Sequence, residues 1–220
     1  MKSTIWLVVL LILVGSCTQD EAIGEGQISY RITLESVWSP ETHPNQFPLN
    51  AEVSPFLAVS HEDYIQIFDV DQLASPGIKA LAETGSINPL DDEINDLIEA
   101  ERANDMVTST RIASPGIAYA ELNLDNQSHY VSLVAKINPS PDWFIAVQGI
   151  DLVENGQWVD SKAAKVVVYD AGTDLGNTYT SIDNPALQPL TISEVDKGPI
   201  TNAEGGVSTV AIVRFERVGR

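Results

Sequence analysis

The chain has 220 residues, with 12 lysines and arginines against 31 aspartates and glutamates, so its formal net charge at pH 7 is −19. This acidic balance argues against binding to nucleic acid and against electrostatic attachment to anionic lipid, because both partners are themselves negative. Cys17 is the single cysteine, which excludes an intramolecular disulfide. The length suits one domain that is held together by packing, with divalent cations as natural counter-ions for its surface.

The first sixteen residues are typical of a targeting signal rather than of a folded domain. A positive start precedes the apolar run Ile5–Val14, which is too short to span a membrane, since a spanning helix needs about 20 residues. Val14-Gly15-Ser16-Cys17 looks like the lipobox of bacterial lipoproteins, although Val14 stands where leucine is usual. By this resemblance residues 1–16 are a lipoprotein signal peptide and residues 17–26 are a lipidated tether. The alternative is ordinary secretion with cleavage nearby.

The lipobox resemblance implies a place in the bacterial cell envelope, with attachment to a membrane through lipid on Cys17. Thr18, in place of an aspartate after Cys17, favours sorting to the outer membrane, facing either the periplasm or the outside. Removal of residues 1–16 takes away one lysine, which leaves 11 basic and 31 acidic residues and a formal charge of −20 (11 − 31). Salt in the surroundings would screen the self-repulsion of such a surface.

The remaining chain, residues 27–220, is predicted to be one mainly β domain. Alternating apolar and polar residues predict a first strand over 28–34, and five more strands are predicted at Ala118–Leu124, Tyr130–Ile137, Phe144–Leu152, Ala164–Tyr169 and Val207–Arg217. Asp125-Asn126-Gln127 predicts a hairpin turn between the first two of these five. Several strands at short spacing, without regular alternation with helices, indicate an antiparallel β-sandwich.

One or two short helices are predicted in the connections. A short helix is predicted over Ile78–Thr84 and the residues just before it. Ser75 suits its N-cap, Pro76 its first helical position, and Gly85 its end. Asn88-Pro89 repeats this start signal and is followed by acidic residues, which favour a helix N-terminus. An apolar face that recurs at helical spacing predicts a second helix over Pro89–Asn104.

The candidate chemistry lies between residues 139 and 174. If Phe144–Leu152 and Ala164–Tyr169 pair as an antiparallel hairpin, the start of the first strand lies beside the end of the second. Asp142, Asp170 and Asp174 then meet at one edge of the sheet, and such crowding of carboxylates favours a bound cation. Oxygen ligands favour Ca²⁺ over zinc or copper. The alternative is that the three aspartates only cap their own turns.

Other candidate sites have weaker support. The histidines His43, His61 and His129 lack the spacing of a zinc site. The chain has no Gly-x-Ser-x-Gly elbow, and nothing in it selects a pair of glycosidase carboxylates. We therefore expect no catalytic residues and no enzyme. A carbohydrate-binding or hydrolytic surface protein that uses acidic residues is the alternative.

Five blocks of the sequence resemble the spondin N-terminal domain family, in the family's order and over about residues 29–218. They are Trp38-Ser39 with His43-Pro44-Asn45-Gln46-Phe47-Pro48, Ser60-His61, Ala74-Ser75-Pro76-Gly77-Ile78-Lys79 with Ala82-Glu83-Thr84-Gly85, Pro139-Ser140-Pro141-Asp142-Trp143-Phe144, and Asp170-Ala171-Gly172-Thr173-Asp174-Leu175-Gly176. The resemblance implies a β-sandwich similar to the calcium-dependent membrane-binding modules of synaptotagmin type. It also implies one Ca²⁺ ion, with ligands at Asp142, Asp170 and Asp174. The chain departs from the animal members in having no disulfides.

Together these observations predict an envelope-anchored, calcium-binding lipoprotein whose spondin-like domain is a binding or adhesion module. We expect a monomer. Its extracellular ligand is expected to be a protein or a glycan, whose identity the sequence does not specify. Backbone carbonyls of residues 170–174, Thr173 and waters are candidates to complete the calcium shell, because Ca²⁺ takes about six to eight oxygens.

Overall fold

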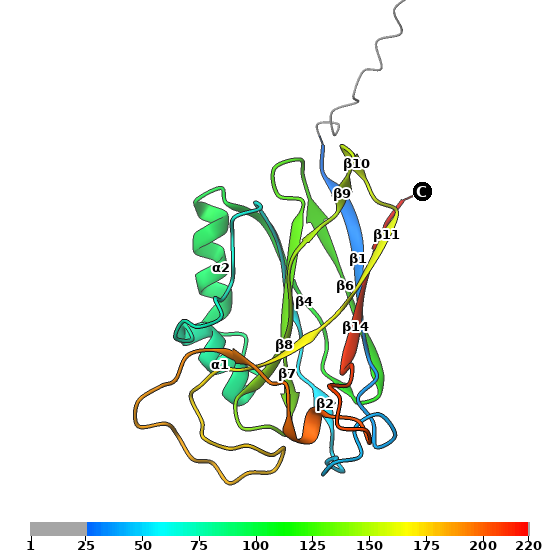
Figure 1. Ribbon diagram of the computed structural model, residues 1–220. Coiled ribbons are helices and arrows are strands. Elements are labelled where there is room, and N and C mark those ends of the chain that lie inside the picture. Colours follow the sequence, from blue (N-terminus) through cyan, green and yellow to red (C-terminus); the bar gives the residue numbers. More distant parts are fainter. Residues whose placement is uncertain (1–25, 220) are drawn as a thin grey trace, which may run out of the picture.

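The computed structural model describes residues 26–219, which form two antiparallel β-sheets packed face to face, with two helices outside the larger sheet (Figure 1). The smaller sheet has the strand order β11-β14-β1-β6, with bounds β11 Ser161–Lys165, β14 Ala211–Arg217, β1 Ile28–Ser36 and β6 Gly116–Leu124. All of its neighbouring strands are antiparallel. The prediction of a mainly β, antiparallel sandwich is confirmed. The likeness to synaptotagmin-type modules stays a prediction.

The larger sheet has eight strands, six of them in the order β13-β12-β8-β7-β2-β5, while β3 pairs with β7 and β4 pairs with β3. The bounds are β13 Ser193–Glu194, β12 Val167–Asp170, β8 Trp143–Asp151, β7 Tyr130–Asn138, β2 Glu52–Val53, β5 Ile112–Ala113, β3 Leu57–His61 and β4 Ala103–Thr108. The other elements are a small ribbon of β9 Val153–Glu154 and β10 Gln157–Trp158, the helices α1 Pro76–Thr84 and α2 Leu90–Glu99, and the 3₁₀ turn η1 Gly198–Ile200.

The larger sheet is apolar on both faces, which explains the near-continuous apolar runs of its central strands. On β7, Leu133 and Ala135 pack in the core between the two sheets, while Val134 packs on the opposite face with residues of α1 and α2. The same alternation on β8 sends Ile145 to one core and Phe144 to the other. Figure 1 shows α1 and α2 covering this outer face. Within residues 26–219, neither helix is long and apolar enough to cross a membrane.

Helix α1 begins and ends where the local signals predict. The Ser75 hydroxyl oxygen accepts a hydrogen bond from the amide of Ile78 at 3.1 Å, as an N-cap does. At the other end Gly85 has φ +73°, and its amide donates to the carbonyl of Leu81 at 2.7 Å. This left-handed cap is strained for residues other than glycine.

Helix α2 is shorter than predicted. Its acidic first turn is confirmed, but the helix ends at Glu99, and β4 begins at Ala103, inside the predicted helical range. Glu101 has φ +57°, so the backbone leaves the helical region there. The prediction of a helix through Asn104 was wrong because pairing of β4 with β3 competes with helical hydrogen bonds for the same residues.

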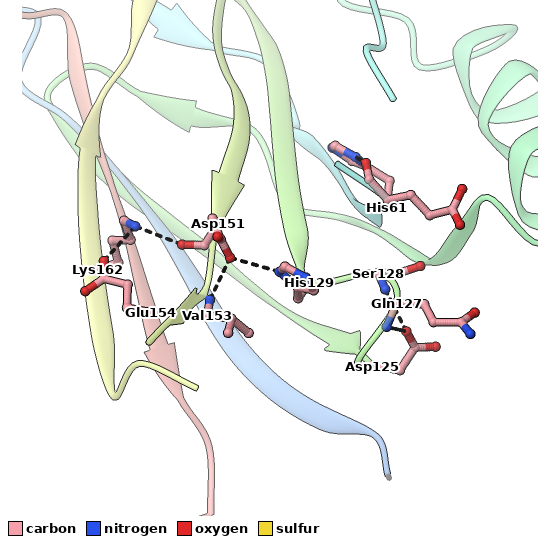
Figure 2. Close-up of polar contacts among 10 residues, drawn as sticks. His61, Asp125, Gln127, Ser128, His129, Asp151, Val153, Glu154 and Lys162 are labelled. Carbon is pink, nitrogen blue, oxygen red and sulfur yellow. Dashed lines mark hydrogen bonds and ion pairs between the residues drawn. The ribbon is translucent and has the colours of Figure 1, made fainter. Parts of the chain in front are cut away.

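The predicted hairpin between β6 and β7 is also wrong, because the two strands lie in different sheets. The local turn itself exists: the Asp125 carboxylate accepts hydrogen bonds from the amides of Gln127 and Ser128 at 2.9 and 2.7 Å (Figure 2). β6 then pairs with β1, and β7 pairs with β8 and β3. The turn therefore carries the chain from one sheet to the other.

The predicted strand Ala164–Tyr169 divides into two. β11 pairs with β14 in the smaller sheet, whereas β12 pairs with β8 in the larger sheet. Between them Val166 is buried, and its amide donates to the carbonyl of Ala211 at 3.1 Å. The last predicted strand likewise begins later than expected, at Ala211 rather than Val207. The expected pairing that brings the aspartates together is nevertheless confirmed, because Trp143 lies opposite Asp170.

Candidate metal centre

Asp142 is the most enclosed of the three predicted ligands, with its side chain fully buried just before β8. One carboxylate oxygen, Oδ2, accepts hydrogen bonds from the amides of Thr173 and Asp174 at 2.6 and 3.0 Å. The Thr173 hydroxyl also donates to it, at 3.2 Å. The other oxygen, Oδ1, is buried and has no hydrogen-bond partner within residues 26–219. Burial of a carboxylate oxygen without a donor is costly, and this makes Oδ1 a candidate ligand atom for a cation.

Asp170 ends β12, at the register position opposite the start of β8. Its Oδ2 accepts a hydrogen bond from the Trp143 indole nitrogen at 3.1 Å, and its Oδ1 accepts one from the Gly172 amide at 2.8 Å. Gly172 has φ +72°, and a Cβ atom there would lie 2.4 Å from the Leu190 carbonyl oxygen. Glycine is therefore required at this position, since any other residue would meet both strain and a clash.

Asp174 is buried at the start of the long loop that follows β12. Its two oxygens accept hydrogen bonds from the amides of Gly176 and Asn184, both at 2.7 Å. Asp174 also forms an isolated β-bridge with Pro185. The carboxylate thus ties together two parts of the loop as well as lying near Asp142.

Burial and mutual repulsion act on the protonation of these carboxyl groups. Burial is the main cause that raises the pKa of Asp142, against the lowering effect of the hydrogen bonds from Asp174 and Thr173. Burial, followed by the charge of Asp142, raises the pKa of Asp170 to about 6. The charge of Asp174 adds to both shifts. The three carboxyl groups are therefore close enough to oppose one another's ionisation. A bound cation would offset this repulsion, because an opposite charge favours the ionised form.

The three aspartates lie in one region, but they do not converge on one point. Within residues 26–219 no three His, Cys, Asp or Glu side chains are arranged to hold a metal ion as they stand. The carboxylate oxygens of Asp170 and Asp174 instead accept hydrogen bonds from nearby backbone amides, as expected if these aspartates cap their own turns. Oδ1 of Asp142, which has no partner in the described part of the chain, and the all-oxygen donor set nevertheless fit a hard cation such as Ca²⁺.

The three histidines lie in separate surroundings. His43 is buried, with Nδ1 2.8 Å from the Thr42 hydroxyl oxygen. His61 is buried too, with Nε2 2.8 Å from the Ser132 hydroxyl oxygen. His129 lies 2.9 Å from the Asp151 carboxylate, at the end of β8 that is opposite Asp142 (Figure 2).

Sequence reasoning missed Lys136, a lysine in the apolar strand β7 that is only 2% exposed. The signal was visible, because a single charged residue interrupts the run from Val131 to Ile137. Cys17, the predicted lipidation site, lies outside the described residues, as do the predicted signal peptide of residues 1–16 and the predicted tether up to residue 25.

A hollow of about 510 Å³ adjoins Asp170. Its polar and charged lining residues come from the end of β12, the following loop, β13 and the segment after β13: Asp170, Asn177, Ser193, Glu194, Asp196 and Lys197. The indole of Trp143, which donates to Asp170, also borders it. The arrangement offers a ligand a mixed surface of carboxylates, an amide and one ammonium group.

Fold and site together define an antiparallel β-sandwich module with a carboxylate-rich loop region at one end. The chain belongs to the Spondin_N family, which it matches over residues 28–203. The predicted resemblance is thus confirmed. The chain is 30% identical over 213 residues to spondin-1 of Gallus gallus and to spondin-1 of Homo sapiens, covering 89% of this chain and 26% of each relative. It is 33% identical over 171 residues to spondin-2 of Homo sapiens, covering 76% of this chain and 52% of that relative. The chain therefore matches about a quarter of spondin-1 and about half of spondin-2.

Proposed function

We propose that this protein is a calcium-binding spondin-type module of a lipid-anchored bacterial envelope protein, and that it binds an extracellular protein or glycan rather than catalysing a reaction. The observation that carries the calcium proposal is the buried Oδ1 of Asp142, which has no hydrogen-bond partner within residues 26–219 and lies close to the carboxylates of Asp170 and Asp174. The oxygen donors present are those that Ca²⁺ prefers.

A bound Ca²⁺ ion would supply charge neutralisation at this end of the sandwich. Asp142 precedes β8, Asp170 ends β12, and Asp174 begins the long loop. One ion bound by all three carboxylates would therefore hold these three segments together. The domain has no disulfide to perform that task, because the chain has one cysteine. We therefore expect calcium to act mainly as a stabiliser of the loop region that presents a binding surface.

The attachment to the membrane and the candidate metal site would lie at opposite ends of the sandwich. β1 starts beside the end of β14, since Tyr30 lies opposite Arg217, and Figure 1 shows both at the end of the sandwich that carries β9 and β10. The strand β8 starts at the other end, next to Asp142. If Cys17 carries lipid, the tether would enter the domain at the end away from the aspartates, and these would point away from the membrane.

Calcium titration of the full chain with Cys17→Ser tests the metal site, and thermal unfolding provides a second readout. A ligand at 100 times its dissociation constant stabilises the folded state by about 2.7 kcal/mol. For a domain of this size that corresponds to a rise in melting temperature of roughly 5–10 °C. Asp142→Asn should abolish both the binding heat and the rise, whereas the exposed control Asp63→Asn should keep them. Absence of binding heat with millimolar Ca²⁺ in the parent chain would reject the proposal.

A glycan-binding surface is a second candidate, favoured by the hollow beside Asp170 and its carboxylate and amide lining. A glycan array probed with and without Ca²⁺ distinguishes the two ligand classes: retention of specific glycans selects sugar binding. Membrane fractionation tests the anchor, since a Cys17→Ser chain that stayed in the membrane fraction would contradict lipid attachment at that residue.

A further inference from the structure

A buried ammonium group lies next to the loop that carries Asp142. Lys136 Nζ donates hydrogen bonds to the carbonyl oxygen of Ala82 at 2.5 Å, to the carbonyl and hydroxyl oxygens of Ser140, both at 3.0 Å, and to the carbonyl oxygen of Pro141 at 3.4 Å. All four acceptors are neutral oxygens. The positive charge is therefore held in place by dipoles, and the carboxylates near it do not bind it directly.

These contacts fix the ammonium group between a helix end and the candidate site. Ala82 lies in the last turn of α1, where carbonyls lack helical partners and the helix dipole is negative. Ser140 and Pro141 immediately precede Asp142. At the other end of α1, the Glu93 carboxylate accepts hydrogen bonds from the Ser75 hydroxyl and the Gly77 amide, both at 2.7 Å. The N-terminus of α1 thus lies next to the negative charge of Glu93 from α2, and its C-terminus next to the positive charge of Lys136 from β7. Both charges have the sign that stabilises the helix dipole.

The electrostatic surroundings link Lys136 to the aspartates. Burial lowers the pKa of Lys136 to about 8, while the charges of Asp142, Glu83 and Asp174 act to raise it. The group is therefore still mainly protonated at pH 7. Two of the three carboxylates that attract it are proposed calcium ligands.

We propose that Lys136 is the built-in counter-charge of the metal site, which offsets the charge of Asp142 and Asp174 when no cation is bound and opposes a cation that binds. Lys136 does not touch the metal in this role. It sets the affinity of the site by competing, as a fixed charge, with the ion for the same carboxylates. The inference rests on the proposed function, because it takes Ca²⁺ as the ion that these aspartates bind.

Loss of this charge should make calcium binding stronger. A fixed unit charge within several ångströms of a divalent ion, at the effective dielectric constant of a partly buried site, weakens binding by about tenfold or more. A purely structural lysine would act differently: its removal would lower stability equally with and without calcium.

The test uses the full chain with Cys17→Ser and Ca²⁺ alone as the probe, measured by calorimetry and by thermal unfolding in EDTA and in calcium. Lys136→Met should bind Ca²⁺ about tenfold more tightly than the parent chain, and calcium should raise its melting temperature further. Lys162→Met is the matched control. Lys162 Nζ also donates to a carbonyl, that of Asp151 at 2.8 Å, and pairs with Glu154 at 2.9 Å, but it lies at the other end of β8 (Figure 2). Its removal should leave the calcium affinity unchanged.

The outcomes separate this inference from the proposed function. If the parent chain binds Ca²⁺ and Lys136→Met binds it with equal or lower affinity, the counter-charge role is rejected while the metal site stands. If the parent chain does not bind Ca²⁺, the proposed function itself fails. Should Lys136→Met unfold in EDTA, Lys136→Gln removes the charge but keeps N–H donors for the same oxygens. If neither neutral variant folds even in excess calcium, Lys136 is a structural residue only and the proposal is wrong.

Discussion

The two ends of strand β8 show opposite ways of holding acidic side chains. At the Asp151 end, the carboxylate accepts from the amide of Val153 at 2.8 Å and lies 2.9 Å from the His129 ring, while Lys162 donates to the Asp151 carbonyl (Figure 2). These side chains are partly exposed. At the Asp142 end, the carboxylates are bound by backbone amides and an indole, and the charge of Lys136 is bound to neutral oxygens.

The difference separates a carboxylate with partly exposed partners from a buried carboxylate that has one oxygen without a donor within residues 26–219. Partly exposed carboxylates with a cationic or ionisable partner lose little solvation and need nothing further. Asp142 has an oxygen without a donor within residues 26–219, and burial is the main cause that raises its pKa. Position on the same strand does not decide function; the local balance of burial and charge does.

The largest expected difference between the two ends concerns glycine. Gly172 lies in the aspartate loop with φ +72°, and an added Cβ would lie 2.4 Å from a backbone oxygen, whereas Gly149 near the Asp151 end has φ +60° and open space around it. We expect Gly172→Ala to lower the free energy of unfolding by about 3 kcal/mol or more, and Gly149→Ala by about 1 kcal/mol. Chemical denaturation measures the free energy of unfolding of both variants. Equal losses would show that the backbone of the aspartate loop can shift to accommodate a Cβ atom.

A smaller contrast is expected between the two aspartates that flank β8. In EDTA, Asp142→Ala should lower the free energy of unfolding by about 2–3 kcal/mol, because the amides of Thr173 and Asp174 lose their buried acceptor. Asp151→Ala should cost about 1 kcal/mol or less, since its partners are partly exposed. Urea denaturation of the two variants beside the parent chain provides the measurement. A larger loss at Asp151 would reverse the comparison.

The smallest expected effect is the pH dependence that Asp170 contributes at the aspartate end. The pKa of Asp170 is raised to about 6 in the folded, metal-free protein, above its ordinary value of 3.8. Between about pH 4 and 6 the folded state therefore binds a proton that the unfolded state releases, and stability falls as the pH rises through this window. After allowance for solvent screening, the effect is about 1 kcal/mol.

Asp170→Asn removes this titration. The difference in unfolding free energy between the parent chain and the variant, measured in EDTA, should fall from pH 4 to pH 6 and stay level above it. Asp151→Asn is the control from the other end of β8. A difference that rises with pH at Asp170 would contradict the raised pKa.

Several features were predictable from the sequence because their causes are local. Ser75 and Gly85 mark the ends of α1 through caps that involve residues only three or four positions away. The pairing of β8 with β12 was predicted from two strand-like runs, Phe144–Leu152 and Ala164–Tyr169, and it brings the aspartates to one region. Their convergence on a single metal point is not seen, because each of two aspartates also has a nearby amide to bind.

Other features were not predictable, because they depend on which distant strand is available for pairing. Nothing within Ala164–Tyr169 shows that its first part joins β14 and its last part joins β8. The turn at Asp125 looks the same whether the next strand returns alongside β6 or crosses to the other sheet. Likewise, the sequence shows a lysine at position 136 but not the helix end and the loop that surround it.

The sequence by itself determined the strand-rich pattern, the caps of α1, the absence of disulfides and the family, because these rest on residue type and short spacing. The tertiary structure alone decided which strands share a sheet, that Asp142 has a buried oxygen without a donor among the described residues, and that Lys136 lies beside the loop of Asp142. The physical reason is that burial and electrostatic potential are sums over neighbours that are distant along the chain, and only the folded arrangement specifies those neighbours.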